Sequence, residues 1–572
     1  MPDQTERMKY RRYVPKSIDL SDWTHVKPLF DALLERRIDS VGALQDFYYD
    51  IAGLNSAVSE EFCRIQLATS IDTSDEIARQ RYDRFSETVL MHATPLFKKL
   101  DEMFLESPFL KDLDPHFNQL IRLLENEQRL FRPENVPLGI EDSQLGEKHS
   151  ALIGGMTVAF EGQTLNMTQM SKYLKKTDRG LRERAWYAMA NKRLEFVEAI
   201  DTIYDELITI RDRTARNAGF DNFRDYRHQA YGRFDYSPED CFRFHETVER
   251  TAVPLARKLR ERRRERLGIE SVRPWDLSVD EYGREPLKPF STEKQLVDGV
   301  AAMMDRIYPD LGDSLRLLHR HQNLDLMTRR NKAVVGFNMP LDETRVSFIF
   351  MNAMGYHFDL TVLLHEAGHA VETQACAHEA IPAYRHTPQE WGECASQSME
   401  LLGLEHLDVF YPSAEDRKRC VLDKYEDILT SLVHTARVDA FQHWVYLNPG
   451  HTRAQRRATW LDLVERFGEG VDHRGLEEYS ATSWQGIPHL FIVPFYYIEY
   501  GITQISALQI MRKARTEGHT ALRRWFDAMK LGYSKSIPEL YDAAGLTFRF
   551  HGASAEELIR FVGDEIDRVE NL

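Results

Sequence analysis

The sequence LTVLLHEAGHAV occupies residues 360–371 and contains the pentad HEAGH at residues 365–369. Residues four apart on an α-helix lie on the same face, so a helix here would place His365 and His369 side by side. Two imidazoles in this arrangement can bind one metal ion, and imidazole nitrogen suits Zn²⁺. Glu366 follows the first histidine, where a carboxylate can take a proton from a metal-activated water. The stretch therefore predicts a metal-binding helix that carries its own base.

The residues before the pentad, LTVLL at 360–364, are apolar on nearly every side of a helix. This pattern is typical of a helix buried in a large protein. Burying two imidazoles and a carboxylate there is costly unless something binds them. An accidental match to a five-residue pattern is the alternative, and the apolar surroundings favour the metal site.

A three-ligand zinc site needs another donor, and Glu372 is the nearest one along the chain. It would lie on the same helix, about 10 Å of rise beyond His365, so we expect at most an indirect contact. One known zinc-binding pattern places a third histidine shortly after the pentad. This chain does not match it, because Ala375 stands at the position of that histidine. A better donor lies on a second predicted helix, which starts at the capping sequence TPQE of residues 387–390 and stops at Gly403.

On this second helix Glu393, Gln397 and Glu400 share one face. Acids on one helix face are usually solvated, but the rest of this helix is mostly apolar or small. We expect Glu393 to be the third zinc ligand and Glu400 to orient a ligating histidine by accepting its free ring N–H. Cys394 is expected to be a small buried residue, with a thiolate ligand as the alternative.

The pentad followed by ECASQSME at residues 393–400 resembles the thimet oligopeptidase/oligoendopeptidase F family of zinc metallopeptidases. The resemblance extends to residues 335–338 and 348–352 upstream, and downstream to His489, to residues 494–500 and to residues 544–546. It covers roughly the last 240 residues and is closer to the bacterial oligoendopeptidase branch. It implies a mainly α, two-lobed fold with zinc deep in a substrate channel, and hydrolysis of short unfolded peptides.

The segment at residues 489–500 contains His489, Tyr496, Tyr497 and Tyr500. Peptide hydrolysis passes through a tetrahedral intermediate whose oxyanion needs hydrogen-bond donors, and Tyr O–H and His N–H are suitable. Aromatic residues at helical spacing are more often core packing, but the resemblance implies that this segment lies over the bound peptide. We favour Tyr496 and Tyr500, which would share a helix face, as catalytic donors with His489, and Tyr497 as a substrate contact.

Two short stretches have strand patterns. Residues 347–352, just before the metal helix, are rich in Phe and Ile. As a sheet edge this strand would pair with an extended peptide, and Asn352 would contact substrate; as an interior strand it would not pair. Residues 156–160 and 163–166 predict a hairpin around Glu161 and Gly162.

The chain of 572 residues has no low-complexity linker and no repeat of fixed period. Long amphipathic stretches dominate, so we predict a mainly α protein with a helical N-terminal lobe at residues 1–140 and a catalytic body at residues 141–572. The net charge of −16 disfavours nucleic acid as a partner. The basic stretch at residues 257–266 is interrupted by acids at helical spacing, which predicts a solvated helix face.

Five cysteines, an odd number without C-x-x-C spacing, indicate a reducing compartment. The first residues lack the apolar core of a signal peptide. The most apolar window, residues 489–498, is too short to span a bilayer. We therefore expect a cytoplasmic protein without a membrane partner.

These observations predict a zinc oligoendopeptidase with one Zn²⁺ per chain, acting on internal bonds of short peptides; they do not indicate an oligomeric state. One alternative is an exopeptidase with the same zinc chemistry. The aminopeptidase sequence G-x-M-E-N is absent, whereas Arg385 can serve a carboxypeptidase by binding the terminal carboxylate. Another alternative is a non-catalytic peptide-binding protein on the same fold.

Overall fold

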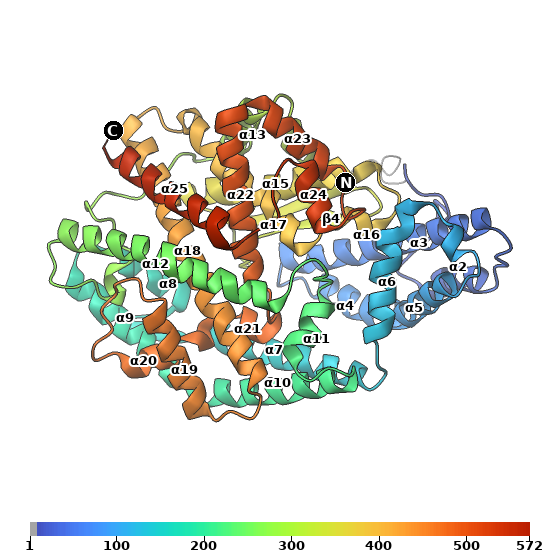
Figure 1. The fold of residues 1–572 in the computed structure, drawn as a ribbon, viewed down its shortest axis with the longest axis horizontal. Coiled ribbons are helices and arrows are strands. Elements are labelled where there is room, and N and C mark those ends of the chain that lie inside the picture. The colour runs from blue at the N-terminus through green and yellow to red at the C-terminus, as the bar shows by residue number, and fades with distance from the viewer. Residues whose placement is uncertain (1–8, 572) are drawn as a thin grey trace. The chain divides into compact units, whose positions relative to one another are not determined.

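The computed structural model describes residues 9–571, and most of its regular structure is helical (Figure 1). Strands in the described residues form only a two-stranded and a three-stranded sheet. The predicted mainly α fold with a small β element beside the helix that carries the pentad is therefore confirmed.

The chain divides into two compact units, each built from three separate segments. Unit 1 comprises the described part of Met1–Gln128 together with Leu287–Arg417 and Ser506–Phe548. Unit 2 comprises Arg129–Pro286, Lys418–Ile505 and the described part of Arg549–Leu572. The units are interleaved along the chain, so they differ from the predicted lobes, whose boundary near residue 140 stays a prediction.

The first segment of unit 1 is a group of helices around an apolar core that includes Val26, Phe30 and Phe47. Side-chain caps set the helix starts: Asp22 accepts a hydrogen bond from the Thr24 N–H, at 2.9 Å. A short π-helical stretch, η1, joins α4 to α5. The elements are α2 (Trp23–Leu34), α3 (Val41–Ile71), α4 (Glu76–Phe85), η1 (Ser86–Leu90), α5 (Met91–Leu105), η2 (Leu110–Asp112), η3 (Pro115–Phe117) and α6 (Asn118–Leu130).

The three-stranded sheet of unit 1 has the order β3-β5-β4. Strand β5 (Val346–Ala353) pairs parallel with β3 (Leu324–Met327) and antiparallel with β4 (Phe337–Leu341). The strand predicted at residues 347–352 is thus the interior strand, paired on both sides, which excludes the alternative that it binds a peptide as a sheet edge. The two edge strands of this sheet are β3 and β4.

Two helices of unit 1, α15 (His357–Ala375) and α17 (Gln389–Gly403), pack directly against each other (Figure 1). The Asp359 carboxylate accepts hydrogen bonds from two backbone N–H groups just before α15, which fixes the start of this helix. A Cβ atom at Gly368 would lie 2.6 Å from the Cα of Ser396. Only glycine therefore permits this backbone contact, which brings the pentad close to the predicted third ligand.

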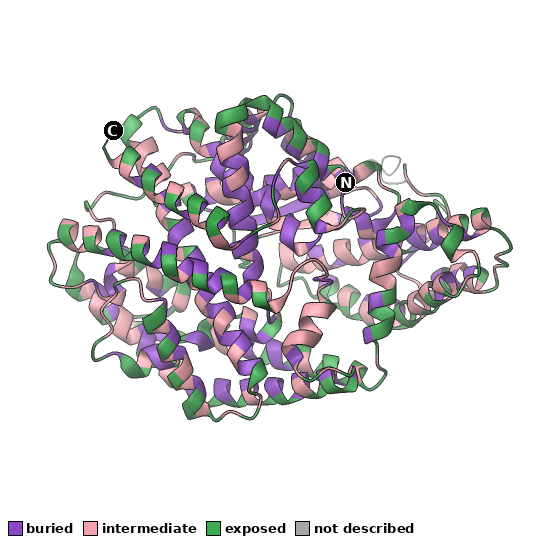
Figure 2. Cartoon of the chain, viewed as in Figure 1, coloured by how far each residue is buried: buried purple, intermediate pink, exposed green. Residues whose placement is uncertain are grey.

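The predicted capping sequence at the start of α17 is wrong in detail. The helix begins at Gln389, Pro388 occupies the capping position, and no side chain caps it. Thr387 instead acts on the buried carboxyl group of Glu372 on α15, whose pKa it lowers against the larger, opposite effect of burial. Nearly all of α17 is buried, whereas α12 (Pro238–Leu267) and α25 (Gly552–Glu570) alternate buried and exposed residues (Figure 2).

The remaining elements of unit 1 surround the sheet and these two helices. They are α13 (Glu293–Ile307), α14 (Asp313–Arg320), η6 (Cys376–His378), α16 (Pro382–Arg385), η7 (Leu404–Val409), the second part of α22 (Ile498–Glu517), α23 (His519–Met529) and α24 (Ile537–Ala543).

Unit 2 contains the predicted hairpin, with β1 (Thr157–Phe160) antiparallel to β2 (Gln163–Asn166). Glu161 and Gly162 both have positive φ, at 49° and 75°, as a tight two-residue hairpin turn requires. Its helices, besides α12 and α25, are α7 (Asn135–Gly154), α8 (Met167–Ser171), η4 (Lys172–Lys175), α9 (Arg179–Leu194), α10 (Val197–Asn217), α11 (Phe223–Ala230), η5 (Pro274–Asp276), α18 (Ala414–Leu447, starting within unit 1), α19 (Arg453–Arg466), α20 (Glu477–Ala481), η8 (Ser483–Gly486), α21 (His489–Ile492) and the first part of α22.

The sequence predicted cysteines without structural disulfides and no membrane-spanning segment. All five cysteines are free thiols, and four of them are buried. Among residues 9–571, no helix combines the length and the apolar character that crossing a bilayer requires.

Candidate metal and catalytic site

Three side chains of α15 and α17 converge in unit 1. One ligand atom each from His365, His369 and Glu393 lies within 4.8 Å of the others. The Glu393 Oε2 atom is 3.2 Å from Nε2 of His365 and 3.6 Å from Nε2 of His369. The two imidazole rings are 5.1 Å apart and nearly perpendicular. The predicted ligand side chains thus meet at one point.

This donor set fits a zinc ion. Ligand atoms about 2.0–2.1 Å from a tetrahedral metal lie about 3.3 Å from each other, close to the separations between Glu393 and the two histidines. Burial would lower the pKa of His365, but hydrogen bonds to Glu393 and Glu400 outweigh it and raise the pKa to about 10. The surrounding carboxylates therefore favour a positive charge at this point, which a bound metal ion would supply.

Glu400, two turns further along α17, contacts the first histidine from the other side of its ring. Its Oε1 atom is 2.7 Å from Nδ1 of His365. A hydrogen bond from Nδ1–H to the carboxylate leaves Nε2 as the nitrogen with a free lone pair. This is the geometry that we predicted for Glu400, namely a carboxylate that fixes the tautomer and direction of a ligating imidazole.

We expect Glu400→Gln to weaken zinc binding about tenfold, because the amide accepts the same hydrogen bond without the negative charge. Competition with a fluorescent chelator would measure the dissociation constant in both proteins. Circular dichroism of the metal-free forms controls for a change in folding. An unchanged zinc affinity in a folded variant would show that Glu400 does not support His365.

Glu366 is buried and lines a cavity of about 500 Å³ together with His365 and Glu400. Its carboxylate makes no hydrogen bond to another described residue, and burial raises its pKa above the usual value for glutamate. A carboxylate in this state is a stronger base than an exposed one. It is therefore suited to take a proton from a molecule in the cavity.

The wall of this cavity is apolar where it meets solvent. Val334 and Phe358 are 84% and 73% exposed, which is unusual for large apolar side chains. Asn352 also lines the cavity, but its amide donates to the carbonyl oxygens of Ala333 and Val335. Asn352 thus shapes the loop before β4, and its predicted contact with substrate stays a prediction.

The alternative ligands from the sequence do not join the three converging side chains. Glu372 lies one turn beyond His369 and is buried, and burial raises its pKa well above the ordinary value. Cys394 is fully buried, as expected, and does not belong to the group formed by the histidines and Glu393.

The predicted aromatic donors form a cluster of their own in unit 2. His489 Nε2 is 3.2 Å from the Tyr500 hydroxyl, and its ring centroid is 6.2 Å from that of Tyr496 and 4.9 Å from that of Tyr497. Burial lowers the pKa of His489, so its imidazole is neutral at pH 7. These four residues therefore come together as hydrogen-bond donors in a partly apolar environment.

One detail of this segment was predicted wrongly. Tyr496 and Tyr500 do not share a helix face, because α21 ends at Ile492 and α22 begins at Ile498. Phe495 between them has a left-handed backbone, with φ of 67°. The two tyrosine rings nevertheless lie 5.4 Å apart, and the Glu499 N–H in the first turn of α22 donates to the Tyr496 carbonyl oxygen.

Comparison with known proteins identifies the chain. Residues 172–558 match the model of peptidase family M3, and residues 17–131 match the M3 N-terminal domain. The chain belongs to peptidase family M3. It is therefore a hydrolase of the metallopeptidase class. This confirms the family to which the sequence was similar.

Solved structures of other peptidases resemble this M3 peptidase over its whole length. A structure of Pz peptidase A with an inhibitor is 27% identical, with a TM-score of 0.86, and covers 98% of this chain and 99% of its own. A protein from Bacillus anthracis assigned as oligoendopeptidase F is 25% identical, with a TM-score of 0.82 and the same coverage. A search of curated protein sequences gave no match.

The cation considered for an exopeptidase is already engaged in this M3 peptidase. Arg385 is buried, and its guanidinium donates to the backbone oxygens of Glu379 and Asp342 and to the Ser56 hydroxyl. It also lies 3.5 Å from the Asp342 carboxylate. A guanidinium with this many partners is a poor receptor for a substrate carboxylate.

Two residues of the site escaped the sequence prediction. The Asn338 amide donates to the backbone oxygen of Glu366, at 2.9 Å, and ties β4 to the metal helix. Gly368 inside the pentad sets the spacing of α15 and α17. Asn338 lies in a stretch that resembles the peptidase family. Neither an asparagine nor a glycine indicates such a structural role in the sequence, because the role depends on neighbours in space.

Proposed function

We propose that this M3 peptidase is a zinc-dependent oligoendopeptidase that hydrolyses internal bonds of short, unfolded peptides, with one Zn²⁺ per chain. The observation that carries the proposal is the convergence of His365, His369 and Glu393 beside the buried Glu366. The similarity to a protein assigned as oligoendopeptidase F supports the endopeptidase activity.

Zinc held by these three ligands would polarise the scissile carbonyl group and lower the pKa of a water molecule. In our proposal the Glu366 carboxylate accepts a proton from the attacking water and later delivers it to the leaving nitrogen. Glu400 holds the His365 ring by accepting its Nδ1–H. Burial raises the pKa of Glu366 above the usual value for glutamate, which makes its carboxylate a stronger base for this proton transfer.

We further propose that His489, Tyr496 and Tyr500 donate hydrogen bonds to the oxyanion that forms during attack. Their support is their mutual contact and the neutral state of the His489 ring. The apolar residues at the cavity rim, Val334 and Phe358, would contact substrate side chains. The edge strand β4 offers backbone groups to an extended peptide, which fits unfolded substrates.

We expect replacing Tyr496 or Tyr500 with Phe to lower kcat about 10²-fold with little change in metal content, because each loses one oxyanion donor. Tyr497→Phe in the same cluster is the matched comparison, and we expect a smaller effect. Steady-state kinetics on a fluorogenic peptide would measure all three. Equal, small effects on kcat would assign the cluster to packing instead.

The function is tested with a mixture of peptides of graded length, each blocked at both ends, with cleavage sites mapped by mass spectrometry. We expect internal cuts in the short peptides, loss of cutting after chelation, and recovery when Zn²⁺ is restored. Cleavage only in peptides with a free terminus would show an exopeptidase. Binding without any cleavage in the zinc-loaded protein would show a non-catalytic peptide-binding protein.

The cytoplasm is the compartment that we propose, because all five cysteines are free and four of them are buried. The proposed partners are peptides rather than nucleic acids, in keeping with the net charge of −16.

A further inference from the structure

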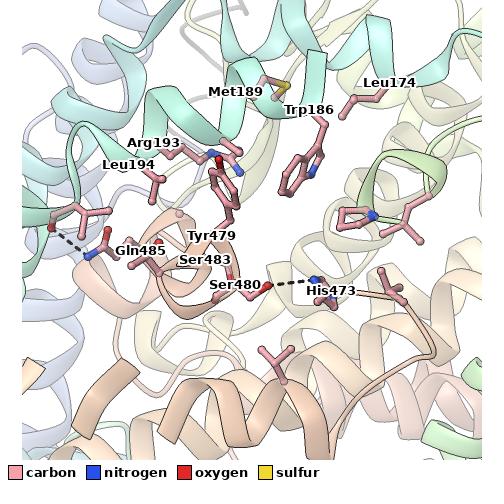
Figure 3. A pocket seen from close by; sticks show the side chains of 18 of the residues that line it. Leu174, Trp186, Met189, Arg193, Leu194, His473, Tyr479, Ser480, Ser483 and Gln485 are labelled. Carbon is pink, nitrogen blue, oxygen red and sulfur yellow. Dashed lines mark hydrogen bonds between the residues drawn. The ribbon is translucent and has the colours of Figure 1, made fainter. Parts of the chain in front are cut away.

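A second cavity lies entirely within unit 2, separate from the residues of the metal site. It has a volume of about 420 Å³ and is lined by residues of several helices, including α9, α10, α19 and α20. Figure 3 shows Trp186, Met189 and Tyr479 around its interior. The Trp186 and Tyr479 rings are 5.4 Å apart and nearly perpendicular, so they form an aromatic wall. This lining is suited to an apolar or aromatic group.

One cation at this cavity has no counter-charge. Arg193, at the end of α9, extends its side chain toward Tyr479 (Figure 3). Its guanidinium makes no hydrogen bond or ion pair with any residue that the structure describes. The side chain keeps contact with solvent, yet the surrounding atoms lower its pKa by desolvation. A guanidinium in such a place is stabilised by an anion.

A second cation, Arg437 on α18, lines the same cavity. Its Nη2 atom donates to Nδ1 of His434, at 2.9 Å, and its buried Nε atom has no partner in the described structure. His434 offers no negative charge, because burial and Arg437 lower its pKa to about 3. The acid that lines this cavity, Glu469, is paired with Arg260 at 2.9 Å. Arg437 thus also lacks a carboxylate within ion-pairing distance.

Three neutral polar side chains of the cavity, Ser480, Ser483 and Gln485, by contrast have partners. The Ser480 hydroxyl is 3.1 Å from Nδ1 of His473, and the Gln485 amide donates to the backbone oxygen of Val197 at 3.2 Å. Trp460 donates to the Ser483 hydroxyl. The two guanidinium groups are the charged groups of this cavity that have no counter-charge in the described structure, and they favour an anion over a neutral polar ligand.

We propose that this cavity binds a carboxylate that is attached to an aromatic or bulky apolar side chain, as at the C-terminal residue of a short peptide. The carboxylate would pair with Arg193 and Arg437, and the side chain would pack against Trp186 and Tyr479. Guanidinium and carboxylate groups form paired, charge-assisted hydrogen bonds, which gives such a site its preference for acids over amides. Only the peptide origin of the ligand rests on the proposed function; the carboxylate chemistry does not.

The test uses isothermal titration calorimetry on the full chain with N-acetyl-L-phenylalanine and, as the neutral comparison, N-acetyl-L-phenylalanine amide. We expect the acid to bind and the amide to bind at least about tenfold more weakly. Arg193→Met keeps the apolar part of the side chain and should weaken binding of the acid by about tenfold or more. Arg184→Met on the same helix is the matched control, because Arg184 is exposed and its ion pair within the described structure is with the exposed Glu161.

The carboxylate of N-acetyl-L-phenylalanine can also bind a catalytic metal. The variant His365→Ala, which lacks a proposed zinc ligand, distinguishes binding at the metal from binding in this cavity. We expect this variant to lose peptidase activity and to bind the acid as the unsubstituted protein does, which separates this proposal from the proposed function. The proposal is overturned if the acid does not bind, if acid and amide bind equally, if Arg193→Met binds as tightly as Arg184→Met, or if His365→Ala abolishes binding. Arg437→Met, checked for folding by circular dichroism, should weaken binding in the same way.

Discussion

Glu366→Gln is expected to lower kcat about 10²–10⁴-fold while the protein still binds one zinc ion per chain. The carboxylate lies next to His365 in the chain, is buried, and makes no hydrogen bond to a described residue. An amide of the same shape fills the same space and leaves the ligands in place, but it cannot accept a proton from water. Steady-state kinetics on a blocked fluorogenic peptide, with zinc measured by mass spectrometry on the same sample, would separate turnover from metal binding.

Glu372→Gln is the matched control for this substitution. Glu372 lies on the same helix and is equally buried, and burial raises its pKa well above the usual value, so the neutral amide resembles the acid that is present. We expect this variant to keep its activity. A Glu366→Gln protein that cleaved peptide at nearly the original rate would remove Glu366 from the role of base.

Much of the geometry of the candidate metal site was predictable because it depends on local periodicity. The helical repeat places His365 and His369 on one face, and the same repeat places Glu393 and Glu400 on one face of the next helix. The short strand before the metal helix was recognisable from its Phe and Ile residues, and the hairpin turn from Glu161 and Gly162. In each case the deciding residues lie within a few turns or a few positions of each other.

Features that depend on distant contacts were not predictable in the same way. Thr387 has the sequence pattern of a helix cap, but no side chain caps α17, and Thr387 instead acts on the buried carboxyl group of Glu372 on α15. Tyr496 lies outside α22, the helix that contains Tyr500, and it follows Phe495, whose left-handed backbone donates its N–H to the Gln442 side chain on α18. A single sequence does not reveal such partners, because they lie 15 and 53 positions away along the chain.

The same reason applies to the interleaved units and to the second cavity. Unit 1 takes up three stretches of the chain, and no change of composition marks the points where the chain passes between units. Arg193 and Arg437 are ordinary helical arginines in the sequence, and their lack of acidic partners is visible only when the neighbouring helices are in place. Charge patterns along a sequence indicate solvated helix faces more readily than they indicate arginines that lack an acidic partner in the fold.

Glu393→Ala is expected to reduce bound zinc from one ion per chain to well below one and to abolish peptide hydrolysis with it. Glu393 is the only one of the three converging side chains that comes from α17, and its Oε2 atom lies within 3.6 Å of both histidine nitrogens. Removing Glu393 leaves two imidazoles as ligands. Loss of a residue that only supports a ligand, such as Glu400, typically weakens metal binding about 10–100-fold, and we expect zinc affinity to fall by more than that here. Metal analysis after dialysis against zinc-buffered solution would measure the loss.

Gln397→Ala, one turn further along the same helix, controls for the loss of buried packing and should keep its zinc. Full zinc content in Glu393→Ala would show that the ligand lies elsewhere. In that case the other described group of metal-binding side chains, Cys241, Asp439 and His443 in unit 2, is the first place to examine. His365→Ala in the Glu393→Ala background would then distinguish the two locations, because only metal bound at the pentad depends on His365.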